Sequence, residues 1–145
     1  MPRITVSAVV MRDIQGRVLT VRKRSTSSFM FPGGKPETGE EPRAAAVREV
    51  REELGVDIVP HDLEFLGRWE TQAANEAGYE LVAHVFDWVR SPEYVDRTPI
   101  FPLAEIEELR WSVPADSLTE PDIAPLTRDC VFPLLTSTER SERGR

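Results

Sequence analysis

The stretch from Gly34 to Val56, GKPETGEEPRAAAVREVREELGV, decides the fold. We predict a helix from Pro42 to Leu54, because proline suits the first helical turn and Gly55 suits the position just after a helix end. Acidic residues gather in the last two turns of this helix. A glycine bend and a cluster of carboxylates thus follow each other closely along the chain.

The carboxylates share one face of the predicted helix. Glu49, Glu52 and Glu53 are spaced i, i+3 and i+4, so they are neighbours on the helix surface and are expected to turn away from the core. The opposite face is apolar and is predicted to be buried: Val47, Val50 and Leu54. Like charges at this spacing cost roughly a few tenths of a kcal/mol per pair. A bound divalent cation would offset that cost, because hard cations take carboxylate oxygens as ligands.

A solvated charged face, with Arg48 and Arg51 as intrahelical partners, is the alternative for an isolated REVREE segment. The residues before the segment argue against it. Gly34 is followed after five residues by Glu40, and after seven more by REVREELGV at 48–56. This is the Nudix box, G-x5-E-x7-R-E-U-x-E-E-x-G-U with U bulky and aliphatic, matched at every specified position. At average residue frequencies such a match occurs about once in 10⁹ starting positions. The chain therefore resembles the Nudix family.

The resemblance implies an α/β (α+β) Nudix fold, a mixed β-sheet sandwiched between α-helices. One Nudix domain is expected over residues 1–136, with the box at 34–56, followed by a flexible tail at 137–145. Residue patterning predicts strands around 4–11, 17–23, 63–72, 79–90 and 110–113, and a last helix within 122–135. We expect no regular structure at 24–30 and 91–102, a short acidic segment at 103–109, and no regular element at the glycine pair 33–34.

The resemblance also assigns the metal site. It makes Glu49, Glu52 and Glu53 the catalytic, metal-binding carboxylates, with the backbone carbonyl of Gly33 as a further ligand. The implied cofactor is Mg²⁺, with Mn²⁺ able to take its place. Such an ion can neutralise diphosphate oxygens and lower the pKa of a water molecule.

Other box residues receive supporting roles by the same resemblance. Arg48 would orient the glutamates, and Glu40 would brace the loop against the helix. Gly34 would allow the sharp turn and Gly55 would end the helix.

A carboxylate near the metal must accept the proton of the attacking water. In the family this base lies either in the box helix or in a loop beyond it. Glu105, six residues before Trp111, is the downstream candidate, as in MutT-like members. Glu107 and Glu108 are alternatives, and a merely exposed acidic loop is the alternative for all three.

Basic residues end the second predicted strand just before the glycine-rich loop. In family members such residues often contact substrate phosphate, so Lys23, Arg24 and, less favoured, Arg22 are candidate substrate-binding residues. A solvated strand end is the alternative.

The implied activity is Mg²⁺-dependent hydrolysis of a diphosphate linkage by attack of water at phosphorus. The substrate would be a nucleoside triphosphate or another nucleoside diphosphate derivative, since the stretch Phe29 to Lys35 resembles MutT-like triphosphate hydrolases. One alternative is a non-catalytic Nudix domain that senses a nucleotide or nucleotide sugar, although such domains usually lose box glutamates. Another is a diphosphate isomerase with a catalytic cysteine, but Cys130 lies far beyond the expected region.

Composition limits the partners. The net charge of −7 disfavours nucleic-acid polymers and anionic membranes, which reward clustered Lys and Arg. No run of about 18 apolar residues is present, and one cysteine permits no intrachain disulfide. We therefore expect a cytoplasmic monomer or homodimer whose partner is a small phosphorylated nucleotide.

Overall fold

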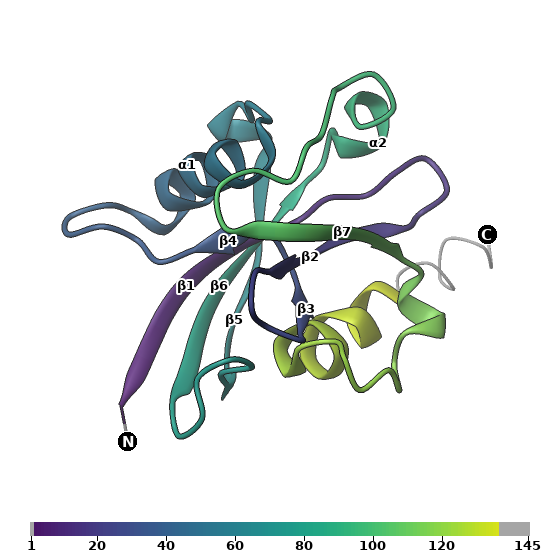
Figure 1. The fold of residues 1–145 in the computed structure, drawn as a ribbon. Helices are drawn as coiled ribbons and strands as arrows, with labels where there is room; N and C mark the ends of the chain where they lie inside the picture. Colours follow the sequence, from purple (N-terminus) through teal and green to yellow (C-terminus); the bar gives the residue numbers. More distant parts are fainter. Residues whose placement is uncertain (1, 137–145) are drawn as a thin grey trace.

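Two β-sheets lie between helices in the computed structural model, which describes residues 2–136 (Figure 1). The first sheet has the order β4-β1-β6-β5 and the second has the order β3-β2-β7. Helix α1 covers one side, and the C-terminal helix, drawn yellow, covers the other. The predicted fold class, a mixed sheet between helices, is confirmed. The predicted tail at 137–145 lies outside the described residues.

The four-stranded sheet is the mixed one. Its strands are β4 (Gly33–Gly34), β1 (Arg3–Val10), β6 (Glu80–Trp88) and β5 (Leu63–Gln72). Strands β1 and β6 run parallel, whereas the β1–β4 and β5–β6 pairs are antiparallel. The other sheet, β3 (Phe29–Met30), β2 (Val18–Lys23) and β7 (Ile106–Ser112), is antiparallel throughout.

Helix α1 (Pro42–Leu54) has the bounds that the sequence predicts. Pro42 stands in the first turn, and Gly55 ends the helix with φ 70°, where its N–H donates to the carbonyl of Arg51. A short helix α2 (Ser91–Tyr94) and two 3₁₀ turns, η1 (Pro60–Asp62) and η2 (Pro114–Asp116), occupy connections. The C-terminal helix spans 125–136, and its segment η3 (Leu126–Val131) has π-helical hydrogen bonding.

Each helical layer buries its own apolar cluster against the sheets. Val50 and Leu54 of α1 are fully buried together with Val9, Leu19 and other sheet residues. On the other side, Val131 and Phe132 of the C-terminal helix pack with Val10 and Val85. These two cores hold α1 and the C-terminal helix in fixed positions on opposite faces of the sheets.

Four short segments differ from the prediction. Gly33–Gly34 form strand β4 rather than an irregular bend, because a glycine lets the backbone pair closely with β1: a Cβ on Gly33 would lie 2.0 Å from the Ser7 carbonyl oxygen. Strand β3 lies in the predicted loop 24–30, and α2 lies in the predicted irregular segment 91–102. Strand β7 begins at Ile106, not at 110, since only Ile106 of its first residues is buried and the acidic residues hide the alternation.

Within the described range 2–136, the structure has no helix that is both long and apolar enough to cross a membrane.

Candidate active site

The side chain of Glu53 lies between α1 and the glycine strand. The Gly33 N–H donates to Glu53 Oε1 at 3.0 Å, and the Glu53 side chain is only 2% exposed. Its second oxygen, Oε2, is buried without a hydrogen-bond partner. Burial raises the pKa of Glu53 to about 8, although the Gly33 N–H favours the charged form. The expectation that all three carboxylates turn away from the core is therefore wrong for Glu53, because β4 packs directly beside this helix face.

Glu49 occupies the space that a side chain at position 34 would need. A Cβ built on Gly34 would lie 2.4 Å from Cδ of Glu49, well inside any real contact distance. The Glu49 side chain is 15% exposed, and burial raises its pKa although Arg48 acts in the opposite direction. A side chain at position 34 would therefore displace the Glu49 carboxylate from its present place.

Arg48 joins the loop to the helix. Its Nε and Nη2 donate to the two carboxylate oxygens of Glu40 at 2.9 and 2.8 Å, and Nη2 also donates to the Lys35 carbonyl at 3.0 Å. Nη1 donates to Glu49 Oε1 at 2.8 Å and lies 3.5 Å from Glu52 Oε1. The bidentate guanidinium holds the pKa of Glu40 down at about 2, helped by the Glu37 N–H.

The donor set suits a hard divalent cation. Glu49 and Glu53 lie against the glycine strand, and Glu52 lies 3.5 Å from Arg48 on the same helix. The buried Oε2 of Glu53 is an oxygen without a partner. Over residues 2–136, no three acidic, histidine or cysteine side chains already stand grouped as metal ligands. Arg48 engages Glu49 and the Gly33 N–H engages Glu53, so these carboxylates are held by protein donors.

Lys23 and Glu105 meet opposite the carboxylate helix. Lys23 Nζ lies 3.2 Å from Glu105 Oε1, and the Arg24 N–H donates to the Glu105 carbonyl at 2.8 Å. The positive charge of Lys23 lowers the pKa of Glu53 and the negative charge of Glu105 raises it, though each effect is smaller than that of burial. Both side chains therefore act electrostatically on the buried carboxyl of Glu53.

The other candidates near Glu105 point elsewhere. Glu107 pairs with Arg24 at 3.5 Å, and Glu108 pairs with Arg22 at 2.9 Å. The structure therefore brings Lys23 and Glu105 to the site and leaves the two exposed Arg–Glu pairs beside it.

The segment before Glu105 is fastened to the end of α1. The N–H of Leu103 donates to the Glu53 carbonyl at 2.9 Å, and the N–H of Phe101 donates to the Leu54 carbonyl at 3.3 Å. These bonds satisfy carbonyls that a helix end leaves without partners. Ala104 then adopts φ 51°, an uncommon value for a residue with a side chain, and Glu105 follows it.

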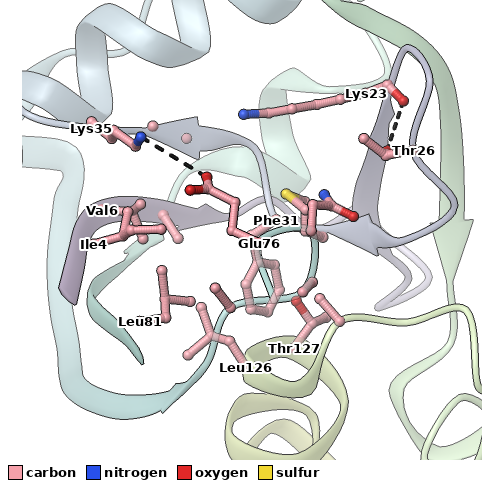
Figure 2. Close-up of a pocket in the computed structure, with 18 of the residues that line it drawn as sticks. Ile4, Val6, Lys23, Thr26, Phe31, Lys35, Glu76, Leu81, Leu126 and Thr127 are labelled. Atoms are coloured by element: carbon pink, nitrogen blue, oxygen red, sulfur yellow. Dashed lines mark hydrogen bonds and ion pairs between the residues drawn. The ribbon is translucent and has the colours of Figure 1, made fainter. Parts of the chain in front are cut away.

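A cavity of about 490 Å³ opens beside these groups (Figure 2). One end of it, the charged end, is lined by Lys23, Gly33, Gly34, Lys35 and Glu105. The other, the apolar end, is lined by Ile4, Val6, Phe31, Leu81 and Leu126, together with the side chain of Thr127. The β5–β6 connection contributes 73–76, and Glu76 Oε1 lies 4.0 Å from Lys35 Nζ.

Sequence reasoning missed Lys35, Glu76, Thr127 and the apolar end of the cavity. Lys35 directly follows the glycine pair, so its place in the chain was a usable signal. Thr127 and Glu76 reach the cavity only through the packing of distant elements, and no local pattern marks them.

A mixed sheet between helices, with a glycine strand and one helix whose carboxylates lie against that strand, defines a class of hydrolase domains. The family model described as NUDIX domain matches residues 1–134, and the chain belongs to the Nudix family. The fold is also shared by a solved MutT protein from Methanosarcina mazei, with a TM-score of 0.76 and 23% identity over 96% of both chains. The ORF135 protein of E. coli has a TM-score of 0.67 and 26% identity, over 100% of this chain and 94% of that one.

Curated relatives match a shorter part of this chain than the family model does. An RNA pyrophosphohydrolase of Francisella philomiragia is 41% identical over 59 residues, which are 41% of this chain and 37% of the relative. One from a Marinomonas strain is 32% identical over 60 residues. The matched part thus spans little more than a third of the length of these relatives.

Proposed function

We propose that this chain is a Mg²⁺-dependent pyrophosphohydrolase that cleaves the diphosphate linkage of a nucleoside triphosphate or another nucleoside diphosphate derivative. The observation that carries the proposal is the cavity that has Lys23, Lys35 and Glu105 at one end and apolar side chains at the other. Such a cavity suits a ligand that is anionic at one end and flat and apolar at the other. Its volume lies in the range of small-molecule sites, roughly 300–1,000 Å³.

The metal would be held by Glu49, Glu52 and Glu53, with the Gly33 carbonyl as a further ligand. Bound there, Mg²⁺ would neutralise diphosphate oxygens and lower the pKa of the attacking water. Arg48 would keep the helix and loop in register by its hydrogen bonds to Glu40, Glu49 and Lys35.

Side chains that line the cavity would carry out the proton transfer and bind the phosphates. The Glu105 carboxylate accepts the proton of the water, whose oxygen attacks phosphorus. The bond from phosphorus to the bridging oxygen breaks, and the leaving phosphate departs with the electron pair. Lys23 and Lys35, which line the charged end, bind phosphate oxygens in place of their present partners Glu105 and Glu76. Arg22 and Arg24 would contribute less, because each is paired with a glutamate beside the cavity.

The partner is then a small nucleotide rather than a nucleic-acid polymer. The net charge of −7 opposes a long polyanion. The names of the Francisella and Marinomonas relatives nevertheless make a 5′-triphosphorylated RNA a necessary test substrate.

The decisive experiment is a screen for phosphate or pyrophosphate release with Mg²⁺, with Mn²⁺ and with EDTA. The panel contains nucleoside triphosphates, nucleotide sugars, dinucleoside polyphosphates, ADP-ribose and a 5′-triphosphorylated oligoribonucleotide. We expect metal-dependent turnover of a triphosphate or small diphosphate derivative. If no compound is hydrolysed and one of them raises the melting temperature, the chain is a sensing domain and the proposal fails.

The base is tested by Glu105→Gln, with Glu107→Gln and Glu108→Gln as matched controls from the same segment. We expect Glu105→Gln to lower kcat about 10²-fold or more and to alter the pH profile of kcat. The two controls should retain turnover, since their pairs with Arg24 and Arg22 lie beside the cavity. A Glu105→Gln enzyme with unchanged kcat would assign the base to the helix instead.

A further inference from the structure

The hydroxyl of Thr127 is fully buried and has no hydrogen-bond partner. The hydroxyls of the other buried threonines among the described residues each have a hydrogen-bond partner. Thr20 Oγ1 donates to the Arg110 carbonyl at 2.8 Å, and Thr136 Oγ1 donates to the Phe132 carbonyl at 3.0 Å. A buried hydroxyl without a partner destabilises the folded state, so its presence needs an explanation.

The carbonyl that a helical threonine commonly uses is bonded to another side chain here. A helical threonine commonly donates to the carbonyl four residues earlier, as Thr136 does. For Thr127 that carbonyl belongs to Ile123, which accepts instead from Arg128 Nη1 at 3.2 Å. Thr127 also lies in the π-helical segment η3, where the Phe132 N–H donates to its carbonyl. Single π-turns of this kind often occur at functional sites.

Thr127 is one of the residues that line the cavity, although its own side chain is fully buried. Figure 2 shows it beside Leu126 and close to Phe31. Lys23 and Lys35 lie on the opposite side of the same cavity. A ligand whose phosphates contact the lysines would therefore place its other end against Thr127.

We propose that Thr127 is a specificity-determining residue that makes one hydrogen bond to the edge of a heteroaromatic ring held in the apolar end of the cavity. This inference rests on the proposed function, because it takes the ring to be the base of the nucleotide substrate. The surrounding side chains of Phe31, Leu81 and Leu126 offer the ring apolar contacts. The hydroxyl can donate or accept, so it recognises the position of a polar ring atom more than its type.

The test compares Thr127→Val, which removes the hydroxyl at nearly constant shape, with Thr127→Ser, which keeps it. KM and kcat are measured for ATP, GTP, CTP, UTP and the base-free compound ribose 5-triphosphate. For the best nucleotide we expect Thr127→Val to raise KM about tenfold, which corresponds to one hydrogen bond, with a smaller effect on kcat. Thr127→Ser should restore KM to within about threefold, and the KM of ribose 5-triphosphate should change less than twofold.

Thr136→Val is the matched control on the same helix. It removes a hydroxyl that has a partner, so it should lower the melting temperature and leave the KM ratios between nucleotides unchanged. Thr127→Val should not lower the melting temperature, because it removes a buried group without a partner. Equal KM values for all nucleotides in Thr127→Val and the parent protein would overturn the proposal, as would an equal loss for ribose 5-triphosphate.

Failure of the hydrolase proposal is distinguishable from failure of this one. If no triphosphate is hydrolysed, calorimetric titrations with adenosine, guanosine, cytidine and uridine still probe the apolar end. Weaker binding of the preferred nucleoside to Thr127→Val, restored in Thr127→Ser, would support the role of Thr127 without any turnover. No nucleoside binding at millimolar concentration, or unchanged binding to Thr127→Val, would overturn it.

Discussion

The two ends of the cavity are built in different ways. Beside the charged end the polar groups are already connected: Arg48 contacts Glu40, Glu49 and the Lys35 carbonyl, and Lys23 pairs with Glu105. At the apolar end one hydroxyl, that of Thr127, stands without a partner near Phe31, Leu81 and Leu126. The first arrangement fixes the geometry of a reaction before any ligand arrives. The second leaves a polar group to be satisfied by the ligand, which is a basis for selection.

The largest expected effect comes from replacing the buried carboxyl group of Glu53 beside the charged end. Glu53→Gln should lower kcat at least about 10²-fold, because the amide cannot supply a carboxylate to a metal or take a proton. The fold should persist, since the amide oxygen can still accept from the Gly33 N–H and burial disfavours a charge here. Activity assays and thermal melts on the same samples test both statements. Near-normal turnover would remove Glu53 from the proposed site.

Replacing the connecting guanidinium should have the next largest effect. Arg48→Lys keeps the positive charge but loses the bidentate contact with Glu40 and the bond to the Lys35 carbonyl. We expect a loss of about 2 kcal/mol in the free energy of unfolding. We also expect kcat to fall about tenfold or more as Glu49 loses its orientation.

Arg51→Lys is the control for this variant, because Arg51 lies on the same helix with a 73% exposed side chain. Its single ion pair, with Asp57, should contribute little. Chemical denaturation of both variants gives the comparison. Similar losses in the two would show that Arg48 has no special role.

The Glu40–Arg48 pair should also make stability depend on pH in a defined window. The folded pKa of Glu40, about 2, lies below its unfolded value of about 4.3. The pair therefore stabilises the fold fully above about pH 5, and this contribution is lost as the pH falls toward 2. Melting temperatures of the parent and Glu40→Gln should differ by a constant amount near neutral pH and converge below about pH 4. A gap that widens on acidification would contradict this sign.

The smallest effect is expected at the cavity rim. Glu76 lies 4.0 Å from Lys35, and both side chains are largely exposed. Glu76→Gln should leave the melting temperature unchanged within about a degree. It should lower KM for the substrate only about two- to threefold at low salt, by freeing Lys35 for phosphate. Glu93→Gln, which removes an exposed pair with Arg90 outside the cavity lining, should leave KM unchanged.

The arrangement of the box residues beside the charged end could be predicted because these residues are close in sequence. Pro42 and Gly55 mark the ends of α1, and the box spacing fixes Glu40 relative to Arg48. The burial of Glu53 could not be predicted in the same way. The i, i+3, i+4 rule gives the face of the helix, but not which part of that face the β4 strand covers.

The apolar end could not be predicted because it depends on tertiary packing. Ile4 and Leu81 come from the neighbouring parallel strands β1 and β6. Leu126 and Thr127 come from the C-terminal helix, which covers the sheets on the side opposite to α1. The π-helical turn that directs Thr127 has no local sequence signature in LTRDCV. The choice among Glu105, Glu107 and Glu108 also depends on tertiary contacts. Glu107 and Glu108 pair with arginines beside the cavity, and this pairing has no signal in the sequence.

Two backbone hydrogen bonds join segment 101–103 to the end of α1. Deuterium exchange can therefore detect the separation of this segment from the helix. The amide proton of Leu103 is bonded to the carbonyl of Glu53 itself, and that of Phe101 to the carbonyl of Leu54. These protons exchange only when the segment leading to Glu105 leaves the helix end, so their protection reports the free energy of that opening. Two amides remote in sequence from the box thus measure the free energy that holds the two acidic segments of the site together.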